Sequence, residues 1–165
     1  GDLGCYCVSM ARLAAGERPA RVSATSRLTG TGVDKFTAGT LEYPSGAVAQ
    51  IACGMRLARH QRTQIVGDDG VIELDMSFSI PADQALTVRL LRGGRRPSEE
   101  LIAIPPADHF LIEAEGFAAL TATSHGSQGL PEVPLAESLD NAATIDALRD
   151  SARLGRAVEL TEIEG

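Results

Sequence analysis

The residues of this chain best suited to proton transfer are Asp2 and Tyr6, an acid and a phenol four positions apart near the start of the sequence. Positions i and i+4 of a helix lie on one face, so this spacing predicts a carboxylate and a phenol side by side on a first helical turn. A phenol can exchange a proton with a substrate hydroxyl when a nearby charge tunes it. The same pair also fits a helix N-cap followed by a tyrosine at the edge of the core, and both interpretations stay open at this point.

The remaining side chains that could bind a metal or act in catalysis give weaker signals. Cys5 and Cys7 are two positions apart and Cys53 stands alone, whereas a zinc site needs about four ligands, so no metal site is predicted. The histidines at positions 60, 109 and 125 fall on different predicted elements and are expected to be ordinary surface or hydrogen-bonded side chains. Lys35 is the only lysine, which limits any mechanism that needs a lysine.

Glycine-rich stretches do not form a nucleotide-binding loop in this chain. Gly30-Thr31-Gly32 lies between two predicted strands, so it does not present a helix N-terminus to a phosphate. Neither a G-x-G-x-x-G nor a Walker sequence occurs. The arginines around Gly93-Gly94 match an anion site, but a solvated hairpin tip explains them more simply. We therefore predict no cofactor-binding residue within the chain.

The hydrophobic period predicts the elements that position these residues. A helix is followed by a run of strands, a pair of helices and a final strand, and the tight turns between the strands favour antiparallel pairing. This order predicts an α+β fold, an open-faced, largely antiparallel β-sheet with helices packed on one face. The expected helices cover residues 3–15, 110–121 and 135–154, and the expected strands cover 20–28, 33–43, 47–55, 60–66, 71–75, 85–92, 100–104 and 158–160. In the last helix the buried side is expected to carry Leu139, Ala142, Ala143, Ile145, Leu148 and Ala152.

Composition narrows the class of protein. With 165 residues, 44% of them hydrophobic, the chain is expected to form one domain, residues 1–165, with a core of its own. The formal net charge of −7 argues against a nucleic-acid partner. The sequence has no run of apolar residues long enough for a membrane span, and an odd number of cysteines suggests a reducing compartment, the cytoplasm. Because the first methionine is Met10, inside a predicted helix, we expect a fragment or a processed product.

Several short motifs follow one another in an order that resembles a known family. They are Gly1-Asp2-Leu3-Gly4-Cys5-Tyr6, Gly16-Glu17-Arg18-Pro19, Gly32-Val33-Asp34, Leu41-Glu42-Tyr43-Pro44-Ser45-Gly46-Ala47, Ile65-Val66-Gly67-Asp68-Asp69-Gly70-Val71-Ile72, Glu137-Ser138-Leu139-Asp140-Asn141 and Ile145-Asp146-Ala147-Leu148-Arg149-Asp150-Ser151-Ala152. Together they resemble the C-terminal domain of the glucose–fructose oxidoreductase / inositol dehydrogenase / MocA family. Tyrosine at position 6 is closer to the sugar-oxidoreductase and dihydrodiol-dehydrogenase branch than to the inositol-dehydrogenase branch.

The resemblance implies an NAD- or NADP-dependent oxidoreductase acting on a secondary alcohol of a sugar, cyclitol or diol. It places Asp2 and Tyr6 as the catalytic pair facing the substrate, and an N-terminal Rossmann domain, absent from this chain, as the main cofactor site. The family's catalytic lysine belongs to an E-K-P motif of that other domain, and Lys35 is not a substitute. The resemblance also implies a homodimer or tetramer assembled through the open sheet face. The alternative is a binding or assembly module that kept this fold without the chemistry.

Overall fold

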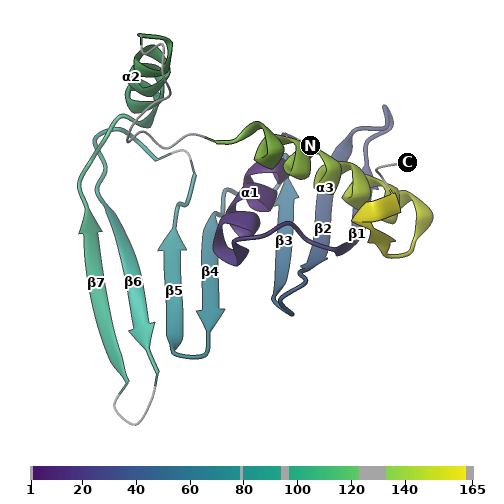
Figure 1. The fold of residues 1–165 in the computed structure, drawn as a ribbon, viewed down its shortest axis with the longest axis horizontal. Helices are drawn as coiled ribbons and strands as arrows, with labels where there is room; N and C mark the ends of the chain where they lie inside the picture. Colours follow the sequence, from purple (N-terminus) through teal and green to yellow (C-terminus); the bar gives the residue numbers. More distant parts are fainter. Residues whose placement is uncertain (1, 79, 94–96, 123–132, 163–165) are drawn as a thin grey trace. The chain divides into compact units, whose positions relative to one another are not determined.

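The structure, a computed structural model, describes residues 2–78, 80–93, 97–122 and 133–162. Over these residues it contains three α-helices and two four-stranded antiparallel sheets, so the predicted α+β class with antiparallel strands is confirmed. The chain divides into two compact units, Gly1–Ala58 with Val133–Gly165 (unit 1) and Arg59–Glu132 (unit 2). Figure 1 shows the elements of each unit.

Unit 1 is a sheet with two helices on one face. Its strands lie in the order β3-β2-β1-β8, and α3 packs on β1 while α1 packs on β3. Gly16 and Gly155 end the two helices in the left-handed conformation, with φ of 74° and 68°, which glycine adopts without a steric penalty. The elements are α1 (Gly4–Ala15), β1 (Arg21–Leu28), β2 (Asp34–Glu42), β3 (Val48–Gly54), α3 (Leu135–Leu154), β8 (Val158–Glu159) and a 3₁₀ turn (Leu160–Glu162).

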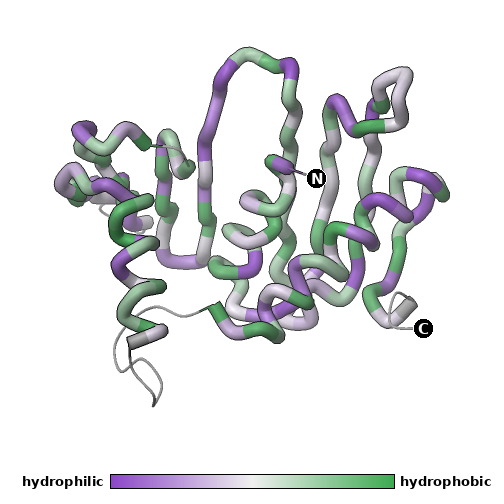
Figure 2. The backbone as a smooth tube through the Cα atoms, turned by 90° about the horizontal axis from the view of Figure 1, so that it is seen from above, coloured by the Kyte–Doolittle hydropathy of each residue, from purple (hydrophilic) through white to green (hydrophobic). Residues whose placement is uncertain are grey.

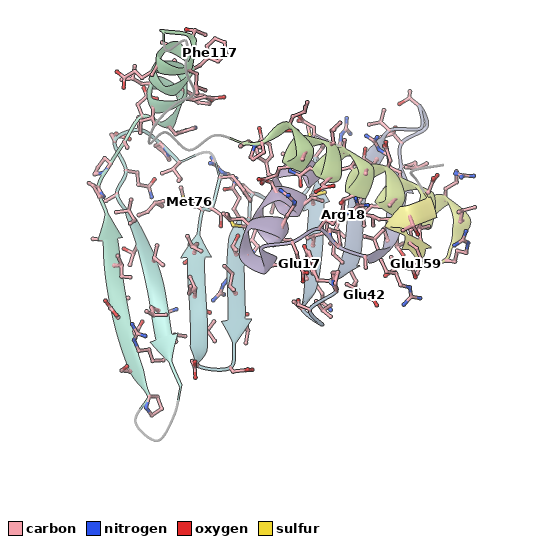
Figure 3. All side chains as sticks on the ribbon, in the orientation of Figure 1. Glu17, Arg18, Glu42, Met76, Phe117 and Glu159 are labelled. Atoms are coloured by element: carbon pink, nitrogen blue, oxygen red, sulfur yellow. The ribbon has the colours of Figure 1, made fainter. Side chains whose placement is uncertain are left out.

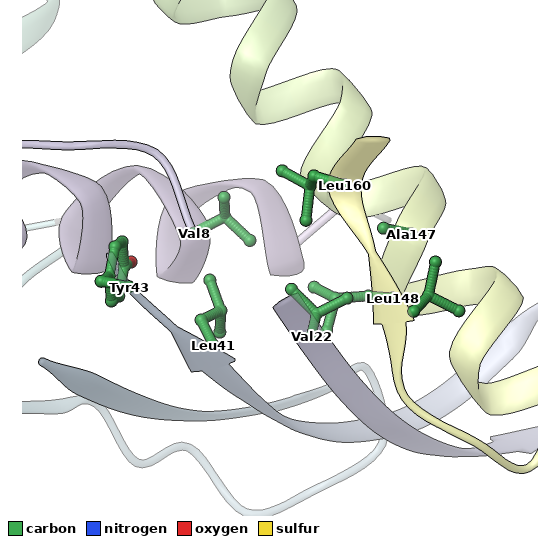
Figure 4. Packing of buried hydrophobic residues seen from close by; sticks show 8 residues of the cluster. Val8, Val22, Leu41, Tyr43, Ala147, Leu148 and Leu160 are labelled. Carbon is green, nitrogen blue, oxygen red and sulfur yellow. The ribbon is translucent and has the colours of Figure 1, made fainter. Parts of the chain in front are cut away.

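The hydrophobic core of the described chain lies entirely in unit 1 (Figure 4). Val8 of α1 meets Val22 and Leu41 of the sheet, and Leu148 of α3 closes the other side. Tyr43, Ala147, Val158 and Leu160 complete the cluster. Gly39 of β2 lies under α3, where an added Cβ would come within 2.9 Å of the Leu148 side chain.

The buried side of α3 differs from the predicted one. Leu139 and Ala142 are exposed, and the buried positions are Thr144, Ala147, Leu148 and Ser151. The two hydroxyls tolerate burial because each has a partner. Thr144 Oγ1 donates to the Asp140 carbonyl at 2.7 Å, and Ser151 Oγ donates to the Arg156 carbonyl at 2.6 Å and accepts from the Ala24 amide at 2.9 Å.

Unit 2 consists of a meander sheet and one helix. Its strands pair in chain order, and the elements are β4 (Arg62–Gly67), β5 (Gly70–Asp75), β6 (Leu86–Arg92), β7 (Ser98–Ile104) and α2 (His109–Ala122). The carboxylate of Asp108 caps α2 by accepting from the amides of Phe110 and Leu111, both at 3.1 Å. Among the described residues, unit 2 contributes no side chain to the hydrophobic core.

Two sequence predictions concern segments that the structure describes only in part. Between the second and third predicted helices, residues 124–134 are expected to form a loop rich in glycine and proline, and most of them lie outside the described residues. Arg95 and Arg96 of the predicted hairpin tip lie outside them too. Among the described helices, none is long and apolar enough to cross a membrane.

Candidate functional site

Tyr6 occupies the first turns of α1 on the side that faces away from the core. Two positions later Val8 is completely buried in the core cluster, whereas Tyr6 is 53% exposed. A helix whose inner face is anchored in a core presents its outer face rigidly, since the buried side chains fix its rotation. The phenol of Tyr6 is therefore held on an exposed surface by a well-packed element.

Asp2 lies in the turn before α1, because the helix begins at Gly4 and its N-cap residue is Leu3. The N-cap makes no side-chain hydrogen bond, so the interpretation of Asp2 as the capping residue is wrong. The helical i, i+4 geometry does not apply to Asp2 and Tyr6 either. It is the backbone carbonyl of Asp2 that is engaged, accepting from the Cys5 thiol at 3.1 Å.

A cavity of about 360 Å³ opens in unit 1 between α1, α3 and the sheet. Its walls are mostly apolar, and its size is in the range of small-molecule pockets. Local sequence patterns do not predict this cavity, because α3 supplies part of its lining and lies far along the chain from α1 and strands β1–β3. The lining residues are Gly4, Val8, Ser26, Leu28, Gly32, Asp34, Thr37, Ile51, Cys53, Ile145, Leu148, Arg149, Ala152 and Arg153.

The three cysteines lie at the α1–β3 side of unit 1 and are free thiols. Cys7 Sγ approaches the Ala52 carbonyl at 4.0 Å, and Cys53 lines the cavity. Burial raises the pKa of both Cys7 and Cys53. In the part of the chain that the structure describes, no three His, Cys, Asp or Glu side chains come together as metal ligands.

The other candidate residues do not gather around Tyr6. His60 is exposed just before β4, His109 begins α2 with its ring 4.2 Å from that of Phe110, and His125 lies outside the described residues. Lys35 lies on β2, in agreement with the strand predicted over 33–43, and its side chain is exposed.

A charged network fixes α1 against α3 and was not predicted. Arg12, whose side chain is 17% exposed, pairs with Glu137 at 2.7 Å and with Asp140 at 3.4 Å. Arg18 also reaches Asp140 at 3.4 Å. Nearby, burial raises the pKa of Tyr43, and its hydroxyl has no partner among the described residues. The network holds the helix that carries Tyr6.

A second charged cluster crosses the sheet of unit 2. Glu73 of β5 is buried and accepts from Arg62 at 2.8 Å, Gln64 at 2.8 Å and Arg89 at 2.7 Å. Arg89 continues to Glu99 of β7 at 2.9 Å. Burial raises the pKa of Glu73, but the hydrogen bond from Gln64 and the charges of Arg62 and Arg89 outweigh it and hold that pKa below its ordinary value.

Fold and site together define an α+β domain that presents a tyrosine-bearing helix on one side of an antiparallel sheet. Residues 1–73 match the model of the GFO/IDH/MocA C-terminal domain. The predicted resemblance to this family is therefore confirmed.

Comparison with individual proteins gives the same class. The chain is 36% identical over 160 residues to D-xylose 1-dehydrogenase (NADP(+)) 2 of Haloferax volcanii, a match covering 96% of this chain and 47% of that protein. It is 35% identical over 74 residues to trans-1,2-dihydrobenzene-1,2-diol dehydrogenase of Xenopus laevis, a match covering 44% of this chain and 22% of that protein. Among solved structures, a 3-ketoreductase from Actinomadura kijaniata in complex with NADP and TDP-benzene superimposes with a TM-score of 0.77 at 26% identity. The match covers 91% of this chain and 44% of the ketoreductase. The chain thus spans less than half the length of each of these proteins.

Proposed function

We propose that residues 1–165 form the C-terminal substrate-binding and oligomerisation domain of an NAD(P)-dependent oxidoreductase. The intact enzyme would transfer a hydride between the nicotinamide and a secondary alcohol of a sugar, cyclitol or diol. The observation that carries this proposal is the 36% identity to a D-xylose 1-dehydrogenase along 96% of the chain. The diol dehydrogenases and the NADP-bound ketoreductase support the same reaction class. The three free thiols favour a reducing compartment, and we propose the cytoplasm.

NAD or NADP would be held mainly by the N-terminal Rossmann domain of the intact protein. No dinucleotide-binding glycine loop occurs in the sequence of this chain, and no residue of it is assigned to the cofactor. When bound, the nicotinamide ring accepts or supplies the hydride. The residues of this chain would bind and orient the substrate beside it and take part in moving the hydroxyl proton.

Tyr6 is the residue we propose for the proton. Its phenol is exposed on a helix whose opposite face is locked into the core, which suits a group that must meet a substrate in one orientation. Asp2, in the turn just before α1, would accept hydrogen bonds from substrate hydroxyls. As hydride leaves the carbinol carbon, the hydroxyl proton must pass to a base, and Tyr6 would relay it.

The test is a steady-state assay of the intact protein with NADP or NAD and a panel of aldoses, cyclitols and diols. Tyr6→Phe should lower kcat by about 100-fold or more with a smaller effect on KM, since general acid–base groups contribute that much. Tyr43→Phe is the matched control, because the Tyr43 hydroxyl is buried without a partner among the described residues and should not matter to turnover. Equal rates for wild type and Tyr6→Phe would remove Tyr6 from the proton path. Asp2→Asn should raise KM more than it lowers kcat.

Cofactor titration separates this proposal from the alternative of a binding or assembly module without chemistry. NADPH fluorescence should report binding to the intact protein and none to the 165-residue chain alone. An intact protein that binds neither dinucleotide would support the module. Tight binding by the 165-residue chain alone would contradict the assignment of the cofactor to the other domain.

We also propose that homo-oligomers assemble through the open sheet of unit 2. Residues directly opposite one another share a face, and the register brings Ile65, Ile72 and Leu90 into one row and Leu74, Val88 and Ile102 into the next. An apolar sheet face of this kind calls for a covering surface. Val88→Glu should lower the oligomer mass in light scattering of the intact protein. Thr87→Glu, on the opposite face, should leave it unchanged, and loss of mass in both variants would contradict the assignment.

A further inference from the structure

Helix α2 carries apolar side chains around most of its circumference. Phe110 and Phe117 are seven positions apart, so they share one face, and Leu111 and Ile112 lie on others. Figure 2 colours most of this helix as hydrophobic. A helix with apolar side chains all round is normally enclosed by protein, since a surface helix needs only one apolar stripe.

The large side chains of α2 are nevertheless exposed in this chain. Phe110 is 70% exposed and Phe117 68%, and Leu111 and Ile112 are more than half exposed. Phe117 projects outward from the helix in Figure 3. Among the described residues, α2 makes no extensive contact with the strands of its own unit. The helix itself is well formed, with Asp108 as its N-cap, so its exposure does not reflect a poor helix.

The charges on and around α2 argue against a second copy as its cover. The described part of the helix carries Glu113 and Glu115, Asp108 precedes it, and no lysine or arginine occurs between residues 97 and 122. His109 is the only side chain of this stretch that can become cationic. A two-fold contact through α2 would bring like charges together and would cover only one side of each helix.

We propose that α2 is the docking helix for the nucleotide-binding half of the intact protein. This inference rests on the proposed function, which supplies that half, and on the relatives, of which the chain spans less than half. The receiving surface would be an apolar groove enclosing Phe110 and Phe117, with lysine or arginine side chains opposite Glu113 and Glu115. Helix-in-groove recognition uses anchors at this spacing along one face.

The test is site-specific photocrosslinking in the intact protein. p-Benzoylphenylalanine in place of Phe117 keeps an aromatic side chain and should crosslink to peptides of the nucleotide-binding half of the same molecule. The matched control is the same probe in place of Val66, which is 69% exposed on β4 and should give no such product. Mixing isotopically labelled and unlabelled protein separates crosslinks within a molecule from those between copies.

Hydrogen exchange provides a second measurement that does not depend on the probe. Exchange of the α2 amides should be slow in the intact protein and about tenfold faster in Phe117→Asp. Crosslinks to any other part of residues 1–165 of the same molecule, crosslinks to a second copy, or no crosslink at position 117 would each overturn the inference. NADPH binding is measured in parallel on the unmodified intact protein. If NADPH does not bind, the proposed function fails. If NADPH binds but the crosslinks do not reach the nucleotide-binding half, the inference about α2 fails alone.

Discussion

Replacing Arg12 by alanine tests whether the charged network between α1 and α3 holds the helix that carries Tyr6. Arg12 is 17% exposed and faces two carboxylates, at 2.7 Å and 3.4 Å. Its removal leaves Glu137 and Asp140 partly buried, and among the described residues Arg18 remains beside Asp140. Exposed ion pairs contribute about 0–1 kcal/mol to stability, and breaking a fully buried ion pair costs about 3–5 kcal/mol. Because these ion pairs are half-buried, Arg12→Ala should lower the unfolding free energy by about 2 kcal/mol.

Urea denaturation followed by tyrosine fluorescence is a suitable assay for this loss. The protein has no tryptophan, and both of its tyrosines, Tyr6 and Tyr43, belong to unit 1, so the signal reports on the unit that contains Arg12. With a slope of about 2 kcal/mol per molar urea, the midpoint should fall by about 1 M. Arg149→Ala is the control, because Arg149 is 62% exposed and pairs only locally with Asp146 in the described structure, and it should cost less than about 0.5 kcal/mol. Equal midpoints for the two variants, or no coupling between Arg12→Ala and Glu137→Gln in a double-mutant cycle, would refute the reasoning.

Three further predictions concern packing, charge and thiol chemistry. Gly39→Ala should lower the unfolding free energy by about 1–3 kcal/mol in the same urea assay, because the new methyl would lie 2.9 Å from the Leu148 side chain; an unchanged midpoint would contradict this contact. The depressed pKa of Glu73 stabilises the fold above the ordinary carboxyl pKa of 4.5, and that contribution is lost as the pH falls toward the lower folded value. Circular dichroism at graded acidic pH should therefore show a shallower loss of folded signal in Glu73→Gln than in wild type. Parallel curves would rule out the Glu73 carboxylate as a source of the pH dependence. Burial raises the pKa of Cys7 and Cys53, so iodoacetamide at pH 7.5 should modify both more slowly than free cysteine, with rates that rise at higher pH; modification at the free-cysteine rate, read by peptide mass spectrometry, would contradict their burial.

Local patterns predicted the elements well because each carries its own signal. Period-two alternation marked β1 and β3, and clusters of turn residues separated the later strands. The turn at Pro44-Ser45-Gly46 placed the β2–β3 hairpin, where the Gly46 amide donates to the Tyr43 carbonyl at 2.9 Å. The helices began within one residue of their predicted starts. These features depend on neighbours in sequence, which a single chain displays directly.

Burial on α3 was not predictable from hydropathy alone. Leu139 is apolar and exposed, while Thr144 and Ser151 are polar and buried. A hydroxyl side chain can face the core when it finds a hydrogen-bond acceptor there. The Ser151 hydroxyl finds one in the Arg156 carbonyl, beyond the end of its own helix. The same dependence on tertiary partners explains why the cavity and the Arg12 network were missed.

The site residues show a similar split between local and distant information. Tyr6 could be singled out from its position in the first helix, and its exposure agrees with a role at a surface. The helical pairing with Asp2 failed because the helix starts at Gly4, two residues too late to include the acid. Helix starts are uncertain by one or two residues, so an i, i+4 argument is weakest at an N-terminus.

The two units differ in what holds them together, and this difference bears on how the chain works. Unit 1 contains a core, and α1 is fastened to that core by Val8 and to α3 by Arg12, so Tyr6 is positioned by contacts internal to this chain. Among the described residues of unit 2, the buried side chain is Glu73, and the apolar surfaces are a sheet face of mostly half-buried side chains and the exposed helix α2. Strand pairing and one charged cluster do not replace a core, since an isolated sheet needs a covered apolar face to be stable. Under the proposals made above, unit 2 would gain stability from a partner subunit on its sheet and from the nucleotide-binding half on α2.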